Sequence, residues 1–261
     1  MKNVALITGA SGGIGLELAR IHAQTHGDLI LIARSTSKLE QLKKELEAAY
    51  GISVLNIPKD LSIPDATQEV YNQVIAANIQ VDYLINNAGF GDFGNYHETE
   101  WEKEEMMINL NILALTQLTK LFGSDMVERK SGKIMNVSST AAFQPGPLMA
   151  VYYATKHYVQ AYSEALYEEW KGYGVSVTAL CPGATQSGFQ QAADMEDSRL
   201  FKGKKLPTSL EVAEFGYKAM MKGEMTAIHG VMNTILAGSA KFTPKKLLLK
   251  VVRKLQEKTQ P

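Results

Sequence analysis

The sequence contains only one cysteine, Cys181, among 261 residues. A single cysteine excludes an intrachain disulfide and a zinc site built from cysteines, and it argues against a compartment whose proteins depend on disulfides. The five histidines form no recognised metal-ligand motif in the sequence. We therefore expect no metal site in this protein.

Neither sign of charge is in excess, because 27 lysines and arginines balance 27 aspartates and glutamates. The chain lacks the global basic field that holds nucleic acid, so we expect no nucleic-acid partner. Long apolar runs are missing too, since no run approaches the roughly 18 residues that span a bilayer. The first run, Val4 to Ile7, is also too short for the core of a secretory signal. We therefore expect a cytoplasmic protein.

Short apolar segments alternate with longer segments of helical pattern along most of the chain. The apolar segments, which are typical of strands buried on both faces, are 4–7, 29–32, 52–57, 82–85, 134–137 and 175–180. The helical segments between them are 13–25, 37–49, 64–78, 99–122 and 152–171. This alternation predicts right-handed βαβ crossovers and an α/β, doubly wound, Rossmann-type fold with a mostly parallel sheet. Residues 226–230 are a candidate for a last short strand.

Two segments interrupt this alternation. Residues 184–209 are rich in Gly, Gln, Asp and Lys, and a long loop of this kind often serves as a substrate lid. Residues 244–261 place leucines and valines on one helical face with lysines around them. We expect one domain over 1–243 and a basic amphipathic helix over 244–261. Packing of this helix on the domain or on a neighbouring subunit is favoured over contact with a membrane surface.

A glycine-rich turn, Thr8 to Gly15, directly follows the first strand and opens the first helix. Glycines there allow positive φ angles and a close approach of the backbone to a pyrophosphate, and the free N–H groups of the helix attract the anion. A turn that merely packs the helix on the strand is the alternative. The predicted cofactor contacts in this turn are Gly9, Ser11, Gly13, Ile14 and Gly15.

The end of the second strand lacks the carboxylate that usually binds the ribose 2′-hydroxyl of NAD. It reads Ile32-Ala33-Arg34-Ser35, and Arg34 can pair with a 2′-phosphate through its planar guanidinium. We therefore predict NADP(H) rather than NAD(H) as cofactor, the alternative being that Arg34 is a solvated surface charge. The missing acid also argues against a methyltransferase that uses S-adenosylmethionine.

A Tyr–Lys pair with a helical spacing of four, Tyr152 and Lys156, follows a serine at a strand end. That serine, Ser139, lies thirteen residues before Tyr152, at the edge of the sheet where ligands bind in open α/β folds. Tyr167 and Lys171 repeat the spacing, but Ala154 stands thirteen residues before Tyr167. We therefore interpret the second pair as an ordinary helix surface.

Taken together, these motifs resemble the short-chain dehydrogenase/reductase family. Over residues 3–185 the chain also carries, in the expected order, Asp60-Leu61, Asn86-Asn87-Ala88-Gly89, Asn111 and Pro182-Gly183. The resemblance implies a single Rossmann-type domain with seven parallel strands in the order 3-2-1-4-5-6-7. It also implies a nicotinamide cofactor and a homodimer or homotetramer.

The resemblance assigns a role to each site residue. Tyr152 would be the general acid/base, Lys156 would bind the nicotinamide ribose and lower the pKa of the tyrosine, and Ser139 would hydrogen-bond the substrate oxygen. Asn111, rather than nearby Asn109, would hold a water that relays protons to Lys156. Further cofactor contacts would come from Asp60, Leu61, Asn87, Ala88, Gly89, Pro182, Gly183 and Thr185.

The ammonium of Lys156 is strong enough to produce the expected shift in the pKa of Tyr152. Moving a phenol from a pKa of about 10 to about 7 takes about 4 kcal/mol. One ammonium about 4 Å away supplies that much at an effective dielectric near 20. A proton donor that titrates near neutral pH suits the reduction of a carbonyl.

Apolar residues are expected at the mouth of the pocket: Phe90, Phe93, Phe143, Leu148, Met149 and Phe189. They predict an apolar ketone or secondary alcohol as substrate. The leading hypothesis is an NADP-dependent carbonyl reductase or alcohol dehydrogenase. One alternative is a reductase of 3-oxoacyl thioesters of acyl carrier protein or coenzyme A, whose acidic carriers Lys202, Lys204 and Lys205 would suit, although a solvated loop is favoured there. A non-catalytic dinucleotide sensor is a second alternative, against which the intact Tyr–Lys pair argues.

Overall fold

The structure is a computed structural model that describes residues 1–193, 195, 198 and 205–257. Lys202 and Lys204, which the sequence offers as contacts to an acidic carrier, lie outside the described residues. No helix within the described ranges is both long enough and apolar enough to cross a membrane.

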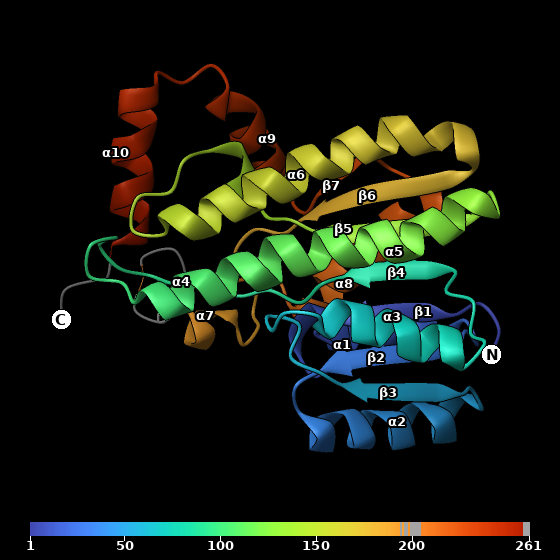
Figure 1. Ribbon diagram of the computed structural model, residues 1–261. Helices are drawn as coiled ribbons and strands as arrows, with labels where there is room; N and C mark the ends of the chain where they lie inside the picture. The colour runs from blue at the N-terminus through green and yellow to red at the C-terminus, as the bar shows by residue number, and fades with distance from the viewer. Residues whose placement is uncertain (194, 196–197, 199–204, 258–261) are drawn as a thin grey trace.

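One parallel sheet of seven strands forms the centre of the molecule (Figure 1). Its strand order is β3-β2-β1-β4-β5-β6-β7, and every neighbouring pair is parallel. The strands are β1 (Ala5–Thr8), β2 (Leu29–Ala33), β3 (Val54–Pro58), β4 (Tyr83–Asn86), β5 (Gly132–Val137), β6 (Val175–Cys181) and β7 (Thr226–Ile228). This confirms the predicted doubly wound Rossmann-type fold, including the short last strand.

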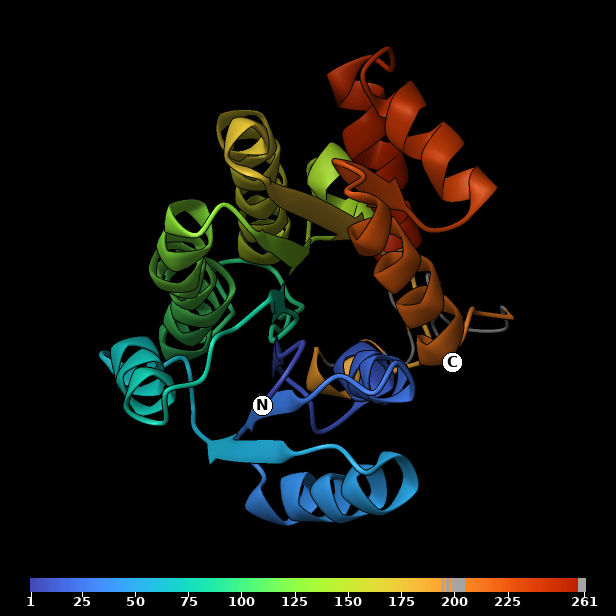
Figure 2. The ribbon, with the colours of Figure 1, turned by 90° about the vertical axis from the view of Figure 1, so that its right-hand side faces the viewer.

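Helices cover both faces of the sheet, as Figures 1 and 2 show. On one face lie α1 (Gly13–Gln24), α2 (Thr36–Tyr50) and α8 (Ser209–Lys222). On the other lie α3 (Ala66–Ala76), α5 (Leu115–Glu128) and α6 (Ala150–Trp170). Each layer buries its own apolar core against the sheet, which is why the strands are apolar at nearly every position.

The remaining helical segments lie at the ends of these layers. They are α4 (Trp101–Ile108), a π-helical segment η1 (Asn109–Ala114), the short 3₁₀ segments η2 (Thr140–Phe143) and η3 (Lys171–Tyr173), α7 (Phe189–Ala192), α9 (Val231–Ala240) and α10 (Lys245–Gln256). The sequence predicts one continuous helix over 99–122, whereas the structure has α4, the π-helical segment and the start of α5. A π-helical turn inside a longer helix has no residue signature of its own, so the pattern did not reveal it.

Two helices near the C-terminus, α8 and α9, are absent from the sequence prediction. The signal for α8 was present: the side chains and backbones of Thr208 and Glu211 form a reciprocal capping box, and Gly223 ends the helix with a φ of +69°. For α9 the only boundary glycine is Gly230, at the position before the helix, where glycine is a weak signal.

The chain order changes direction between β1 and β4, because β2 and β3 lie on one side of β1 and the later strands on the other. In open α/β sheets the crevice at the carboxyl ends of such strands binds the ligand. The glycine turn follows β1, the Asn-Asn-Ala-Gly turn follows β4, and Ser139 follows β5. The fold therefore brings these three segments to the same edge.

Candidate active site

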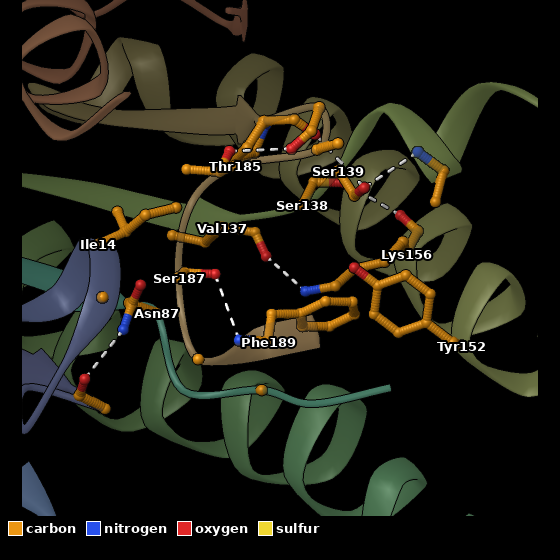
Figure 3. A pocket seen from close by; sticks show the side chains of 18 of the residues that line it. Ile14, Asn87, Val137, Ser138, Ser139, Tyr152, Lys156, Thr185, Ser187 and Phe189 are labelled. Carbon is orange, nitrogen blue, oxygen red and sulfur yellow. Dashed lines mark hydrogen bonds between the residues drawn. The ribbon is translucent and has the colours of Figure 1, made fainter. Parts of the chain in front are cut away.

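A pocket of about 370 Å³ lies at the carboxyl edge of β1, β4, β5 and β6 (Figure 3). The predicted site residues that line it are Gly9, Ser11, Gly13, Ile14, Asn87, Ala88, Gly89, Ser139, Tyr152, Lys156, Pro182, Gly183 and Thr185. Gly15, Asn111, Arg34, Asp60 and Leu61 are not among its lining residues in the described part of the chain. Gly15 and Asn111 support its walls, as described below, and the other three follow the ends of β2 and β3.

The glycine turn and the turn after β4 are tied together by hydrogen bonds. The Oγ1 of Thr8 accepts from the backbone N–H groups of Asn87, at 3.0 Å, and Ala88, at 2.9 Å. The Nδ2 of Asn87 donates to the Thr8 carbonyl at 2.9 Å. A Cβ added to Gly15 would lie 2.4 Å from both Asn87 Nδ2 and the Gly9 carbonyl oxygen. The two turns can pack this closely only because position 15 is a glycine.

The same turn has the shape that a dinucleotide phosphate needs. Gly9 and Gly13 have φ angles of +67° and +55°, values that side-chain-bearing residues rarely adopt. At the start of α1, Gly12 supplies no side chain to cap the helix, so the first N–H groups face the pocket region as donors for an anion. These features fit the diphosphate of a nicotinamide dinucleotide.

Arg34 lies just beyond β2, with its side chain 74% exposed. One of its terminal guanidinium nitrogens lies 4.0 Å from a carboxylate oxygen of Asp60, which is a long ion pair. The other oxygen of Asp60 accepts from the backbone and the hydroxyl of Ser62, at 2.9 and 2.6 Å. Asp60 is thus held in place, while the guanidinium remains largely solvated and available to an added phosphate.

Tyr152 and Lys156 project from one face of α6 into the pocket, and both are buried (Figure 3). The Nζ of Lys156 lies 5.8 Å from the centre of the Tyr152 ring and donates to the carbonyl of Val137, at the end of β5, at 2.8 Å. Ser139 begins the short helix after β5, and its Oγ accepts from the Ala141 N–H at 3.1 Å. The helix and the strand end thus bring the three side chains together.

Burial dominates the protonation of both α6 groups. It raises the pKa of Tyr152 above its ordinary value, and a hydrogen bond with Ser139 acts in the opposite direction. Burial also lowers the pKa of Lys156 to about 8. Burial is the largest effect on the Tyr152 pKa, and the expected lowering by the Lys156 ammonium stays a prediction. Tyr152 therefore holds its proton at neutral pH, which is the state a proton donor needs.

Asn111 lies in the π-helical segment and is buried, whereas Asn109 is partly exposed. Its Nδ2 donates to the Phe90 carbonyl at 2.9 Å and to the Thr155 hydroxyl at 3.2 Å, and its Oδ1 accepts from the Phe90 N–H at 3.2 Å. The amide therefore connects the loop after β4 to α6, next to Lys156. Its expected role in holding a water stays a prediction.

The side of the pocket away from the glycine turn is walled by large side chains. They are Met149, Tyr152, Tyr153, Phe189 and Met195. Of the predicted mouth residues, Met149 and Phe189 line the pocket, and the Phe189 ring centre lies 5.2 Å from that of Tyr152. Phe90 and Phe93 pack against the same apolar cluster. Phe143 and Leu148 are not among the lining residues that the structure describes.

Two members of this wall, Tyr153 and Met195, were not predicted from the sequence. The Tyr153 hydroxyl accepts a hydrogen bond from Gln256 on α10, a partner 103 residues away. No local motif signals such a contact. The segment 184–209 contributes Thr185, Ser187 and Phe189 to the pocket, and its movement as a lid stays a prediction.

A buried chain of polar side chains behind the pocket was also missed. Asn86 Nδ2 donates to Thr119 Oγ1 and to Asn136 Oδ1, both at 2.9 Å, and Asn136 Nδ2 donates to Ser163 Oγ at 3.0 Å. These bonds connect β4 and β5 with α5 and α6. The available signal was an asparagine at or near the carboxyl end of both β4 and β5. Because a buried amide must find partners, the chain fixes α6 against the sheet.

Most of the chain matches a known family. A family model described as short chain dehydrogenase matches residues 3–198. The very-long-chain 3-oxoacyl-CoA reductase of Homo sapiens is 32% identical over 184 residues, which are 68% of this chain and 58% of that protein. The chain thus spans less than two thirds of the length of this curated relative.

Solved structures resemble almost the whole chain. A short-chain dehydrogenase from Sphingobium yanoikuyae in complex with NADPH is 28% identical, with a TM-score of 0.82 and coverage of 92% of this chain and 93% of that one. A bulky-bulky ketone specific alcohol dehydrogenase from Comamonas testosteroni is 25% identical, with a TM-score of 0.79 and coverage of 92% of both chains.

Proposed function

Since the chain belongs to the short-chain dehydrogenase/reductase family of oxidoreductases, we propose that it is an NADPH-dependent reductase of 3-oxoacyl thioesters. The observation that carries the proposal is one pocket that joins a dinucleotide-type glycine turn, a buried Tyr152–Lys156 pair and an apolar wall. The first two features support ketone reduction, and the third supports a substrate with an acyl chain.

The residues at the carboxyl edge of the sheet would hold the cofactor. Gly9 and Gly13 would receive the diphosphate, and Arg34 would pair with the 2′-phosphate that distinguishes NADPH from NADH. When bound, NADPH supplies the hydride for the carbonyl carbon. A solved relative, the Sphingobium yanoikuyae enzyme, is in complex with NADPH, which supports this choice.

The proton comes from this chain's own residues. Tyr152 keeps its phenol proton because burial raises its pKa, and it would give that proton to the substrate oxygen as the carbonyl becomes an alcohol. Ser139 would donate a hydrogen bond to the same oxygen. Lys156, held by the Val137 carbonyl, would keep a positive charge beside the phenolate that remains.

The substrate class rests on the apolar wall and on the relatives. Met149, Phe189 and Met195 offer flexible and aromatic surfaces that suit a hydrocarbon chain beside the reacting ketone. The curated relative is a 3-oxoacyl-CoA reductase by name. A bulky apolar ketone is the second candidate, which the similarity to the ketone-specific alcohol dehydrogenase supports.

A substrate panel tests the proposal. NADPH oxidation is followed with 3-oxoacyl thioesters of coenzyme A and of acyl carrier protein at several chain lengths, and with bulky aryl ketones. We expect kcat/KM for the best thioester to exceed that for the best ketone by about tenfold or more, since each buried methylene favours binding by about 0.8 kcal/mol. A preference for the ketones would select the second candidate. Tight NADPH binding without turnover of any compound would overturn both and favour a dinucleotide sensor.

A further inference from the structure

The helices α9 and α10 follow the last strand and stand beyond the β7 edge of the sheet (Figures 1 and 2). One side of α10 packs on the domain. Leu248 and Val252 belong to the same buried cluster as Met149 and Tyr153, and Gln256 donates to the Tyr153 hydroxyl. Packing on the domain, which the sequence favoured for this helix, therefore accounts for one of its sides.

A second apolar side of the same helix remains exposed. Leu247, Val251 and Leu255 are spaced by four residues, so they form one line along α10, and they are 54%, 47% and 43% exposed. Exposed apolar residues continue over α9 and the turn after it: Val231, Met232, Ile235, Leu236 and Phe242. Phe242 is the most exposed of them, at 90%. We call these eight residues the α9–α10 apolar face. Eight large exposed apolar side chains on two consecutive helices and the turn between them indicate an interaction site.

The charges along α9 and α10 are almost all positive. Between residues 231 and 257 the basic side chains, all exposed, are Lys241, Lys245, Lys246, Lys250, Arg253 and Lys254. Glu257 is the one acidic residue in that segment. Because the whole chain has no net charge, the remainder of the protein is acidic overall. The positive charge is thus concentrated where the apolar side chains are exposed.

We propose that the α9–α10 apolar face binds the surface of a membrane that contains anionic lipids. Leu247, Val251 and Leu255 would enter the boundary between headgroups and acyl chains, while Lys250 and Lys254 beside them on the helix would contact lipid phosphates. Amphipathic helices with basic flanks bind membranes in this way.

Charge decides between a membrane and a second copy of this chain. In a two-fold symmetric dimer the same patch faces itself, which would bring two sets of lysines together and cost binding energy. An anionic surface is attracted by those lysines instead.

Membrane binding does not depend on the proposed substrate, but it would have a consequence for how the substrate reaches the pocket. The opposite side of α10 touches the pocket wall through Gln256 and Tyr153, so the docked enzyme would present that wall close to the lipid.

Vesicle sedimentation of the full chain tests the proposal without any use of turnover. We expect binding to vesicles of phosphatidylcholine that contain phosphatidylglycerol, weaker binding as salt rises, and little binding to phosphatidylcholine alone. Each basic side chain near an anionic surface strengthens binding about five-fold. A triple variant that carries Lys246→Glu, Lys250→Glu and Lys254→Glu should therefore bind the anionic vesicles at least 100-fold more weakly.

Matched variants separate this surface from general charge effects. Lys38→Glu, Lys44→Glu and Lys218→Glu make the same change in net charge at exposed positions of α2 and α8, and they should leave most of the binding intact. Leu247→Asn, Val251→Asn and Leu255→Asn should abolish binding while all six basic residues remain. NADPH binding and thermal denaturation show whether each variant is folded.

Three results would overturn the proposal. The first is absence of binding to the anionic vesicles by the folded wild-type chain. The second is an equal loss of binding in the control lysine variant, which would show a non-specific charge effect. The third is a dimer in sedimentation velocity that the three asparagine substitutions dissociate, without vesicle binding, because a second copy would then cover the face.

Discussion

The two sides of the pocket differ in the chemical groups that line them. The side at the glycine turn exposes main chain where glycines line it, at Gly9, Gly12 and Gly13. The opposite side consists of large side chains, Met149, Phe189 and Met195 among them. The first side is made by turns that directly follow β1 and β4. The second is made where α6, the segment around α7 and α10 meet.

This difference separates a general function from a specific one. A main-chain surface needs glycine at fixed positions, and it binds a diphosphate whatever the substrate is. A side-chain wall can change in shape while the backbone of α6 still presents Tyr152 and Lys156 to the pocket. We therefore expect substitutions on the first side to change cofactor binding or stability, and substitutions on the second side to change substrate preference alone.

Tyr152 stands where the two sides meet, and its substitution should have the largest effect. Tyr152→Phe removes the proton donor but keeps the buried ring, so NADPH affinity should persist while kcat falls at least 100-fold. Fluorescence titration with NADPH and steady-state turnover measure the two quantities. Tyr167→Phe is the control, because Tyr167 and Lys171 repeat the spacing outside the pocket. Turnover within tenfold of wild type for Tyr152→Phe would exclude the assigned role.

Arg34 tests the cofactor side alone. Arg34→Asp removes the cation and adds repulsion against a 2′-phosphate, and hydrogen bonds to charged groups contribute about 1.5–3 kcal/mol. The ratio of kcat/KM for NADPH to that for NADH should fall by about 10- to 100-fold. Lys44→Asp, at an exposed position on α2, makes the same charge change away from the strand end. If both variants keep the wild-type ratio, Arg34 is a surface charge.

Gly15 tests whether the main-chain side is fixed by close packing. A Cβ there would overlap Asn87 and the Gly9 carbonyl, so Gly15→Ala should lower the free energy of unfolding by about 1–3 kcal/mol. Gly238→Ala is the matched control, because no atom lies within 4 Å of its added Cβ on α9. That variant should instead gain about 0.5–1 kcal/mol from helix propensity. Equal effects in urea denaturation would show that the two turns have room to adjust.

The sequence was informative wherever a residue's role depends on its chain neighbours. The strands at 4–7, 29–32 and 175–180 were predicted to within a residue at each end, because strands buried on both faces need continuous apolar runs. The glycine turn and the Tyr152–Lys156 spacing were identified for a similar reason, since each is a short pattern on a single element.

The sequence was uninformative where distant segments meet. Nothing near Tyr153 indicates that Gln256 contacts it, and Met195 joins the wall only because the chain after β6 folds back over the pocket. The π-helical segment that contains buried Asn111 has no residue signature of its own and so escapes a pattern search. For Lys156, the spacing predicted its neighbour Tyr152, but the burial that lowers the pKa of the lysine could not be inferred from spacing.

The pH dependence of kcat/KM tests whether the charge of Lys156 beside Tyr152 is needed for turnover. Burial lowers its pKa to about 8, so the ammonium keeps its proton below that pH and loses it as the pH rises through about 8. The loss removes the cation beside Tyr152, and kcat/KM for NADPH, which reports on groups of the free enzyme, should fall up to tenfold per pH unit above that point. Circular dichroism across the range excludes unfolding. A profile that stays flat well above pH 8 would show that the charge of Lys156 is not required.

Gln256 tests whether the side-chain wall can change without the cofactor side, because it contacts Tyr153 of that wall but does not line the pocket. Gln256→Leu removes the hydrogen bond to the Tyr153 hydroxyl while keeping an apolar contact for α10, and one such bond contributes about 0.5–1.5 kcal/mol. KM for the preferred substrate should rise about two- to tenfold, whereas the Kd for NADPH should stay unchanged. Gln41→Leu, at an exposed position on α2, controls for the loss of an amide. A matching loss of NADPH affinity in Gln256→Leu would mean that the two sides are coupled, and that the wall cannot change independently of the turn that holds the cofactor.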